Sequence, residues 1–113
     1  MDLSSLQGEE LYAVEFVEKH LQLRFAEDAV LTLYSWPEVA DADGISIGVG
    51  QPGYRDALCT LIGETVSEVQ CYDTALTVEF ENGTLLALSL REEDRDTADA
   101  GSFRSIDGEV FDF

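Results

Sequence analysis

The sequence predicts an α+β fold that is mostly β, with two tandem α-β-β-β repeats in pseudo-twofold symmetry and a closing C-terminal hairpin. Residues 6–33 match residues 61–88 without a gap, and apolar residues alternate in segments 20–25 and 75–80. Turn residues separate these segments. Because 113 residues is the usual length of one domain, we expect residues 1–113 to form a single domain.

The internal match depends on a shift of 55 residues, which places Leu6 on Leu61 and Leu33 on Leu88. Eight of the 28 aligned positions are identical. Average residue usage would give about two identities by chance. The identical pairs are Leu6/Leu61, Gly8/Gly63, Glu9/Glu64, Val14/Val69, Leu21/Leu76, Phe25/Phe80, Leu31/Leu86 and Leu33/Leu88. An internal duplication is therefore predicted.

The first repeat covers about residues 2–35 and is expected to begin with at most a turn or two of helix before Gly8. Three strands follow, predicted at residues 10–17, 20–25 and 30–35. A connection of residues 36–53 then leads to the second repeat, and residues 45–49 are its one candidate strand.

The second repeat covers about residues 54–90 and opens with apolar residues at the spacing of a short amphipathic helix, which Gly63 is expected to stop. These apolar residues are Tyr54, Leu58, Leu61 and Ile62. Pro52 and Gly53, just before the helix, suit the centre of a type II turn. The predicted strands are residues 65–72, 75–80 and 84–90. Residues 91–113 are expected to form a charged loop and then a hairpin that turns at Asp107-Gly108.

The turn at Asn82-Gly83 allows two registers. A two-residue loop would place Leu86 and Leu88 on the opposite face from Val78, whereas a three-residue loop over 81–83 keeps the apolar residues on one face. We therefore predict the three-residue loop, with Gly83 in the left-handed conformation. Asp28 stands at the equivalent position of the first repeat and tolerates that conformation better than most residues.

Composition restricts the partners of the chain. Twenty-four acids and six bases give a net charge of −18, a field that repels nucleic acids and anionic membranes and attracts cationic proteins or metal ions. No apolar segment has the length of a membrane helix, and the first residues lack the features of a secretory signal. The expected location is the cytoplasm. The acidity has a second interpretation, because a proteome adapted to salt is acidic throughout.

Residue patterns for catalysis or cofactor binding are missing. His20 is the only histidine, and we expect it to be an exposed residue at the start of a strand. Cys59 and Cys71 lack the spacing of a zinc site and are expected to be reduced thiols. The GxGxxG match at 48–53 contains Pro52, and a calcium loop beginning at Asp41 would lack the later oxygen ligands. We therefore predict no enzyme activity, no cofactor and no metal.

The best candidate for a binding site is at the end of the first repeat. Tyr34 and Trp36 stand where the second repeat has Ser89 and Arg91, and aromatic residues of this kind anchor binding sites. The predicted partner-binding residues are Tyr34, Trp36, Arg24, Glu38, Asp41 and Asp43. A second interpretation is that the two aromatic residues simply pack under the connection that follows them.

The residues Leu-Ile-Gly-Glu-x-Val at 61–66, the strand 76–80 and Asn82-Gly83-x-Leu-Leu resemble small bacterial proteins of unknown function, among them predicted immunity proteins of polymorphic toxin systems. The resemblance supplies no catalytic residues to transfer to this chain, and it implies a small acidic protein that binds a partner protein. We therefore expect a non-enzymatic acidic binding protein that recognises a basic protein. The alternative is a structural or housekeeping domain of an acidic, salt-adapted proteome.

Overall fold

The strands of the chain form two antiparallel sheets of five strands each in the computed structural model, which describes residues 3–94, 98–105 and 107–113. Sheet 1 has the order β1-β2-β3-β9-β10 and sheet 2 the order β5-β4-β8-β7-β6. The strands of sheet 1 are β1 (Leu11–Val17), β2 (His20–Phe25), β3 (Val30–Leu33), β9 (Gly101–Arg104) and β10 (Val110–Asp112). Those of sheet 2 are β4 (Glu38–Ala40), β5 (Ser46–Ile47), β6 (Val66–Cys71), β7 (Ala75–Phe80) and β8 (Leu85–Ser89).

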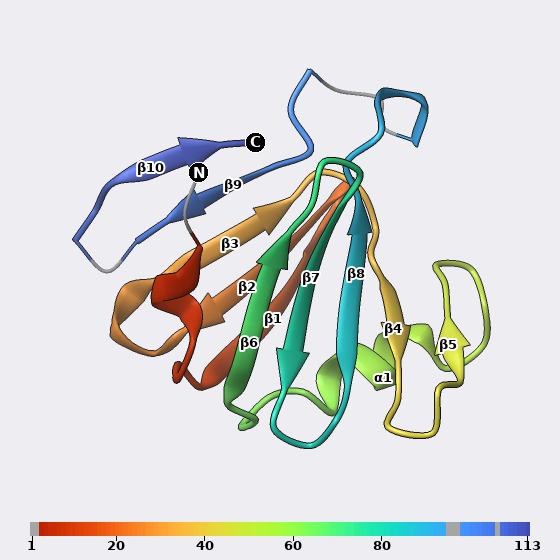
Figure 1. The fold of residues 1–113 in the computed structure, drawn as a ribbon. Coiled ribbons are helices and arrows are strands. Elements are labelled where there is room, and N and C mark those ends of the chain that lie inside the picture. The colour runs from red at the N-terminus through yellow and green to blue at the C-terminus, as the bar shows by residue number, and fades with distance from the viewer. Residues whose placement is uncertain (1–2, 95–97, 106) are drawn as a thin grey trace.

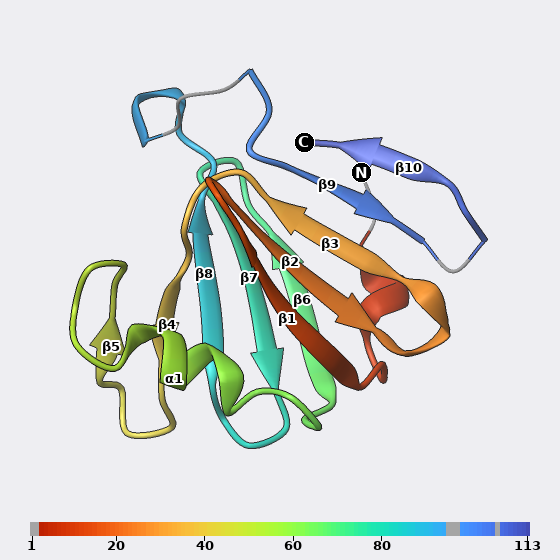
Figure 2. The ribbon, with the colours of Figure 1, turned by 180° about the vertical axis from the view of Figure 1, so that it is seen from behind.

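The two sheets lie one behind the other and enclose the hydrophobic core. Strands β1, β2 and β3 lie behind β6, β7 and β8 in Figure 1 and in front of them in Figure 2. Each sheet contributes its alternating apolar face to one buried cluster. The largest fully buried side chains include Phe25, Phe80 and Phe103. The prediction of a mostly β fold is therefore confirmed.

Short helices pack against the two sheets at the border of the core. The helix α1 (Tyr54–Cys59) lies against sheet 2 on the side of sheet 1, with Tyr54 and Leu58 buried (Figure 2). The 3-10 helix η1 (Ser4–Leu6) contacts β6 and lies on the side of sheet 1 that faces sheet 2. The expected difference in helix length between the two halves is present, since η1 is a single turn. The two other 3-10 helices are η2 (Ala26–Asp28) and η3 (Glu92–Asp94).

The hairpins β1–β2 and β6–β7 have the same register at a shift of 55 residues. Val14 opposes Leu23 in the first hairpin, and Val69 opposes Val78 in the second. Each hairpin has its register shift at the equivalent place, between Leu11 and Ala13 and between Val66 and Glu68. The pairs β2–β3 and β7–β8 also agree, because Leu23 opposes Leu31 and Val78 opposes Leu86.

Reciprocal backbone hydrogen bonds join β1 to β6 where the two strands begin. The Gly8 N–H donates to the Val66 carbonyl at 2.8 Å, and the Gly63 N–H donates to the Leu11 carbonyl at 2.7 Å. An isolated antiparallel bridge between Glu10 and Thr65 lies between these bonds. The two donors are 55 residues apart in the sequence, and so are the two acceptors. The two hydrogen bonds are therefore equivalent under the internal repeat.

The predicted three-residue loop is confirmed. The Phe80 N–H donates to the Thr84 carbonyl at 2.8 Å, and Gly83 has a φ of 90°. Asp28, at the equivalent position, has a φ of 68° and is one of two non-glycine residues with positive φ in the described ranges. Its short polar side chain makes this conformation less costly than it would be for an apolar residue.

The connection between the halves contains two short strands rather than the one expected. Residues 46–47 form β5, inside the predicted segment 45–49, but β4 was not predicted. Val39 is the only buried residue in the three-residue strand, so no alternation marked it in the sequence. It pairs with Leu86 of β8, and this pairing extends sheet 2 beyond the second repeat.

The C-terminal hairpin is confirmed, with β9 and β10 antiparallel and Gly108 at a φ of 85°. It also pairs with β3, so that Phe103 opposes Leu31 and the hairpin completes sheet 1 (Figure 1). The charged loop predicted over 91–100 contains η3, and its residues 95–97 lie outside the described ranges, as does Ile106 of the hairpin. In the part of the chain that is described, no helix is long and apolar enough to cross a lipid bilayer.

Candidate functional site

A groove of about 1030 Å³ opens where the chain crosses between the two sheets. The β1–β2 turn, the β6–β7 turn and the ends of β3 and β8 converge there, at the top of Figure 1. Every one of these segments ends or turns at this point because the hairpins of the two halves run in the same direction in the sandwich. The groove is thus a consequence of the topology.

Equivalent positions of the two halves line this groove with residues of very different size. One half contributes Lys19, His20, Tyr34 and Trp36. The positions 55 residues later are Thr74, Ala75, Ser89 and Arg91, and they line the groove as well. Three large side chains thus stand at positions whose equivalents are Thr, Ala and Ser. The smaller residues of the second half leave space that the first half does not fill.

Aromatic rings form one side of the groove. The ring centroids of His20 and Tyr34 are 5.0 Å apart with an interplanar angle of 56°. Trp36 stacks on Phe16 at 6.2 Å and contacts Tyr54 edge-on at 6.4 Å. His20 is half-buried, so the prediction of an exposed histidine is wrong, because the Tyr34 ring packs against its imidazole.

Trp36 has two roles in this arrangement. It packs against Phe16 and Tyr54, as the packing interpretation required, and it also lines the groove. Its other side borders a second hollow of about 560 Å³ beneath residues 49–53. The Arg55 guanidinium lies 5.0 Å from the centroid of the Phe16 ring, a cation–π distance. Trp36 is therefore fixed by its neighbours and still half-buried at the edge of open space.

Tyr54 supports Trp36 from within the core. Its hydroxyl donates to the carbonyl of Pro37 at 2.5 Å, which ties α1 to the residue after Trp36. Burial of the Tyr54 phenol disfavours its charged form and raises its pKa to about 12. Only the neutral phenol can donate this hydrogen bond.

The raised pKa of Tyr54 predicts how stability depends on alkaline pH. The unfolded phenol titrates near its ordinary value of 10 and the folded phenol at about 12, so the neutral form favours folding below pH 10. We expect this contribution to the free energy of unfolding to be lost as the pH rises from about 10 to about 12. Urea unfolding of the wild type and of Tyr54→Phe at pH 8, 10 and 11.5 measures it. The same alkaline loss in both proteins would contradict the prediction.

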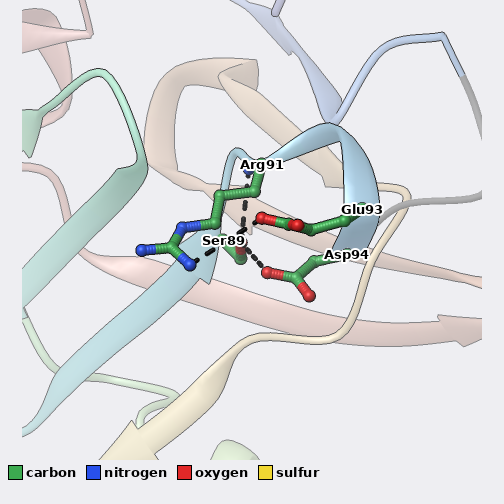
Figure 3. Close-up of polar contacts among 4 residues, drawn as sticks. All are labelled: Ser89, Arg91, Glu93 and Asp94. Carbon is green, nitrogen blue, oxygen red and sulfur yellow. Dashed lines mark hydrogen bonds and ion pairs between the residues drawn. The ribbon is translucent and has the colours of Figure 1, made fainter.

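Polar contacts build a charged rim beside the aromatic side of the groove (Figure 3). The Ser89 hydroxyl donates to Asp94 Oδ2 at 2.6 Å, and the Arg91 backbone N–H donates to Ser89 Oγ at 3.3 Å. Arg91 Nη1 lies 3.8 Å from Glu93 Oε1 on the surface. Ser89 thus holds the chain after β8 in a fixed turn, which keeps Arg91 and Asp94 in the groove lining.

The structure brings together three of the six predicted binding residues. Tyr34, Trp36 and Glu38 line the groove. Asp41 and Asp43 lie in the turn between β4 and β5, where Asp41 Oδ1 accepts the Asp43 N–H at 2.9 Å and the Ile45 N–H at 3.0 Å. Arg24 forms an ion pair with Glu15 on β1 and does not line the groove. These three residues are therefore separate from the aromatic site.

Sequence reasoning missed the charged residues Lys19, Arg91 and Asp94 in the groove. Lys19 and Arg91 stand at positions that differ in character from their repeat equivalents, Thr74 and Trp36, as do the aromatic pairs. A search for strong differences at turn positions of the internal alignment would have found both. The lining therefore combines aromatic rings with two cations and with the carboxylates of Glu38 and Asp94.

The groove combines aromatic rings with charged side chains at its rim. Aromatic rings supply contact area at low entropic cost, and charged side chains at the rim supply direction. Among the described residues, His, Cys, Asp and Glu form no group of three or more that could hold a metal ion. Cys59 and Cys71 are exposed free thiols. Comparison with known proteins found no matching family model, no matching curated protein and no matching solved structure.

Proposed function

We propose that this chain is a non-enzymatic binding protein that recognises a basic protein partner through the groove at Tyr34 and Trp36. The observation that carries the proposal is the half-buried Trp36, which is held in place by Phe16 and Tyr54 and lines open space. A rigid aromatic side chain at the edge of a groove is the usual form of an anchor residue. The net charge of −18 selects a cationic partner.

The proposal includes an internal duplication with a pseudo-twofold axis. Its support is the identical register of the β1–β2 and β6–β7 hairpins and the reciprocal bonds around Glu10 and Thr65. Pseudo-equivalent core positions stay alike because both halves must bury the same face. The residues that line the groove, by contrast, differ in size and charge between the two halves. Such differences are expected if only one half has acquired a binding site. We also propose that the chain binds and blocks its partner in the cytoplasm, as the resemblance to immunity proteins implies.

Kinetics with the partner test this function. The partner is captured from a lysate of the source cells at low salt, purified, and measured against the wild-type chain. Because long-range attraction accelerates encounter, we expect the association rate to fall steeply between low and physiological salt. An association rate that does not depend on salt, or a partner with an acidic contact surface, would contradict the proposal and favour a structural role for an acidic domain.

Replacing Trp36 with alanine should act mainly on dissociation. Loss of an anchor residue costs about 2 kcal/mol or more, so we expect the dissociation rate to rise about 30-fold with little change in association. Surface plasmon resonance measures both rates. Tyr34→Ala serves as a second variant, because Trp36 also packs against Phe16 and Tyr54.

Tyr12→Ala is the matched control for Trp36→Ala, since Tyr12 is 71% exposed on β1 and does not line the groove. It should leave both rates unchanged. Equal effects of the Tyr12 and Trp36 substitutions would show that the groove has no special role.

A further inference from the structure

The charges of the strands are divided unequally between the two sheets. The five strands of sheet 2 contain no lysine and no arginine, whereas sheet 1 contains Arg24 in β2 and Arg104 in β9. The side chains that face away from the core on sheet 2 include Glu38, Glu68 and Glu79. This outer face of sheet 2 faces the viewer in Figure 1, and that of sheet 1 faces the viewer in Figure 2.

Two glutamates of the outer face of sheet 2 oppose each other directly. Glu68 of β6 pairs in register with Glu79 of β7, and like charges at opposed positions destabilise a sheet. Both carboxylates border a shallow hollow of about 250 Å³, together with Tyr72 and Leu85. The Tyr72 side chain is 55% exposed, so its ring is accessible beside these carboxylates.

The equivalent place in the first half is neutralised within the chain. Arg24 stands where the second half has Glu79, and Ala13 stands where it has Glu68. Arg24 forms its ion pair with Glu15. Among the described residues, the same backbone framework therefore has an internal cation on one sheet and two opposed carboxylates without a cation on the other. On the second sheet, Glu68 Oε1 instead accepts a hydrogen bond from Gln70 Nε2 at 2.7 Å. Nothing in the fold requires this difference, because both positions point away from the core.

We infer that the outer face of sheet 2 is the docking surface for the basic protein partner, with the hollow between Glu68 and Glu79 accepting an arginine or lysine side chain. This inference rests on the proposed function and adds the place where charge is recognised. The Glu79 carboxylate and the Glu68 oxygen that does not accept from Gln70 can accept hydrogen bonds from one guanidinium, and Tyr72 offers an aromatic face beside them. The cation would remove the repulsion between the two glutamates, so binding and stability are linked.

The docking surface is continuous with the groove. A row of paired residues crosses sheet 2 from Gln70 through Thr77 and Ala87 to Glu38. Gln70 and Thr77 line the hollow, and Ala87 and Glu38 line the groove. Three strand spacings separate the ends of the row, about 14 Å. One partner surface can therefore fill the groove with its apolar centre and reach the hollow with a basic side chain.

Glu79→Arg tests this inference with a matched control. The substitution places an arginine opposite Glu68, so the variant supplies its own cation, as Arg24 does on sheet 1. We expect its unfolding midpoint to be no lower than that of the wild type, and its affinity for the captured partner to fall by at least about tenfold. Glu109→Arg makes the same charge change on the exposed turn of the C-terminal hairpin and should leave the affinity within about twofold.

A second measurement uses a synthetic oligo-arginine peptide as the probe, with the ¹⁵N-labelled protein observed by NMR. The expected result is saturable shifts at Glu68, Gln70, Tyr72, Thr77 and Glu79 that persist in Glu109→Arg and disappear in Glu79→Arg. Shifts that are equally strong at the β4–β5 turn, or that persist in Glu79→Arg, would overturn the inference.

The two measurements separate this inference from the proposed function. A basic partner that binds Glu79→Arg as tightly as the wild type would overturn the docking surface and leave the proposed function standing. Failure to find any partner with salt-dependent association would contradict the proposed function, while the peptide titration would still decide whether the hollow recognises a guanidinium.

Discussion

Replacing Phe80 with alanine is expected to lower the free energy of unfolding by about 3–5 kcal/mol, the usual range for a fully buried aromatic residue. The Phe80 side chain is 1% exposed and ends the alternating apolar face of β7. Its backbone also closes the hairpin loop through Thr84. Removing the ring leaves a cavity between the two sheets that the surrounding strands can fill only in part. Urea unfolding followed by circular dichroism measures the loss.

Phe25→Ala provides the comparison for Phe80→Ala, because Phe25 is the equivalent residue and is 2% exposed. We expect a loss of similar size, since both rings occupy the same place in their hairpins. Val110→Ala is the control at a side chain that is 59% exposed, with an expected change within about 0.5 kcal/mol. A loss below about 1 kcal/mol at either phenylalanine would contradict the burial of both rings in one core.

Replacing Gly101 with alanine is expected to destabilise the protein by about 1–3 kcal/mol, because the new methyl group has no room. A Cβ atom at Gly101 would lie 2.5 Å from the carbonyl oxygen of Thr32 and 2.6 Å from Cζ of Phe113. One of these contacts is with the backbone of β3, so β9 would have to move away from its neighbour. Thermal unfolding of the variant measures the effect.

Ser102→Ala is the control for Gly101→Ala, since Ser102 is the next residue of β9 and points to the other face of sheet 1. It should change the unfolding midpoint little. NMR amide shifts in Gly101→Ala are expected to concentrate in β3, β9 and the last residues of the chain. An unchanged unfolding midpoint would mean that the C-terminal hairpin is not packed against β3 in solution.

The strands of the two hairpins could be predicted from sequence because their apolar residues alternate without interruption. Leu21, Leu23 and Phe25 are all buried, and the polar residues between them are not. The same alternation decided the loop at Gly83, where only one register keeps Val78 and Leu86 on the same face. A pattern that extends over several residues of one strand therefore indicates both the strand and its register without knowledge of distant contacts.

The parts that could not be predicted depend on contacts between distant residues. Strand β4 has one buried residue, Val39, and becomes a strand only because β8 offers an edge for pairing. The pairing of β9 with β3 is likewise a tertiary event. A three-residue strand cannot show a period, so its sequence does not differ from that of a loop.

The sequence predicts Tyr34, Trp36 and Glu38 of the candidate site but none of its other charged residues. Tyr34 and Trp36 differed visibly from their repeat equivalents, and both line the groove. Arg24 is predicted at the same site because it lies on the outer face of a neighbouring strand, yet it forms its ion pair with Glu15 and does not line the groove. The opposed pair of Glu68 and Glu79 depends on the cross-strand register, which charge composition alone does not contain.

The most direct test of the account is to map the contact surface of the captured basic partner on the ¹⁵N-labelled chain by NMR chemical shifts. We expect the perturbed amides to cluster at Tyr34, Trp36 and Glu38 and to continue across the outer face of sheet 2 to Glu68 and Glu79. Perturbations centred on Arg24 and Arg104, on the outer face of sheet 1, would contradict it.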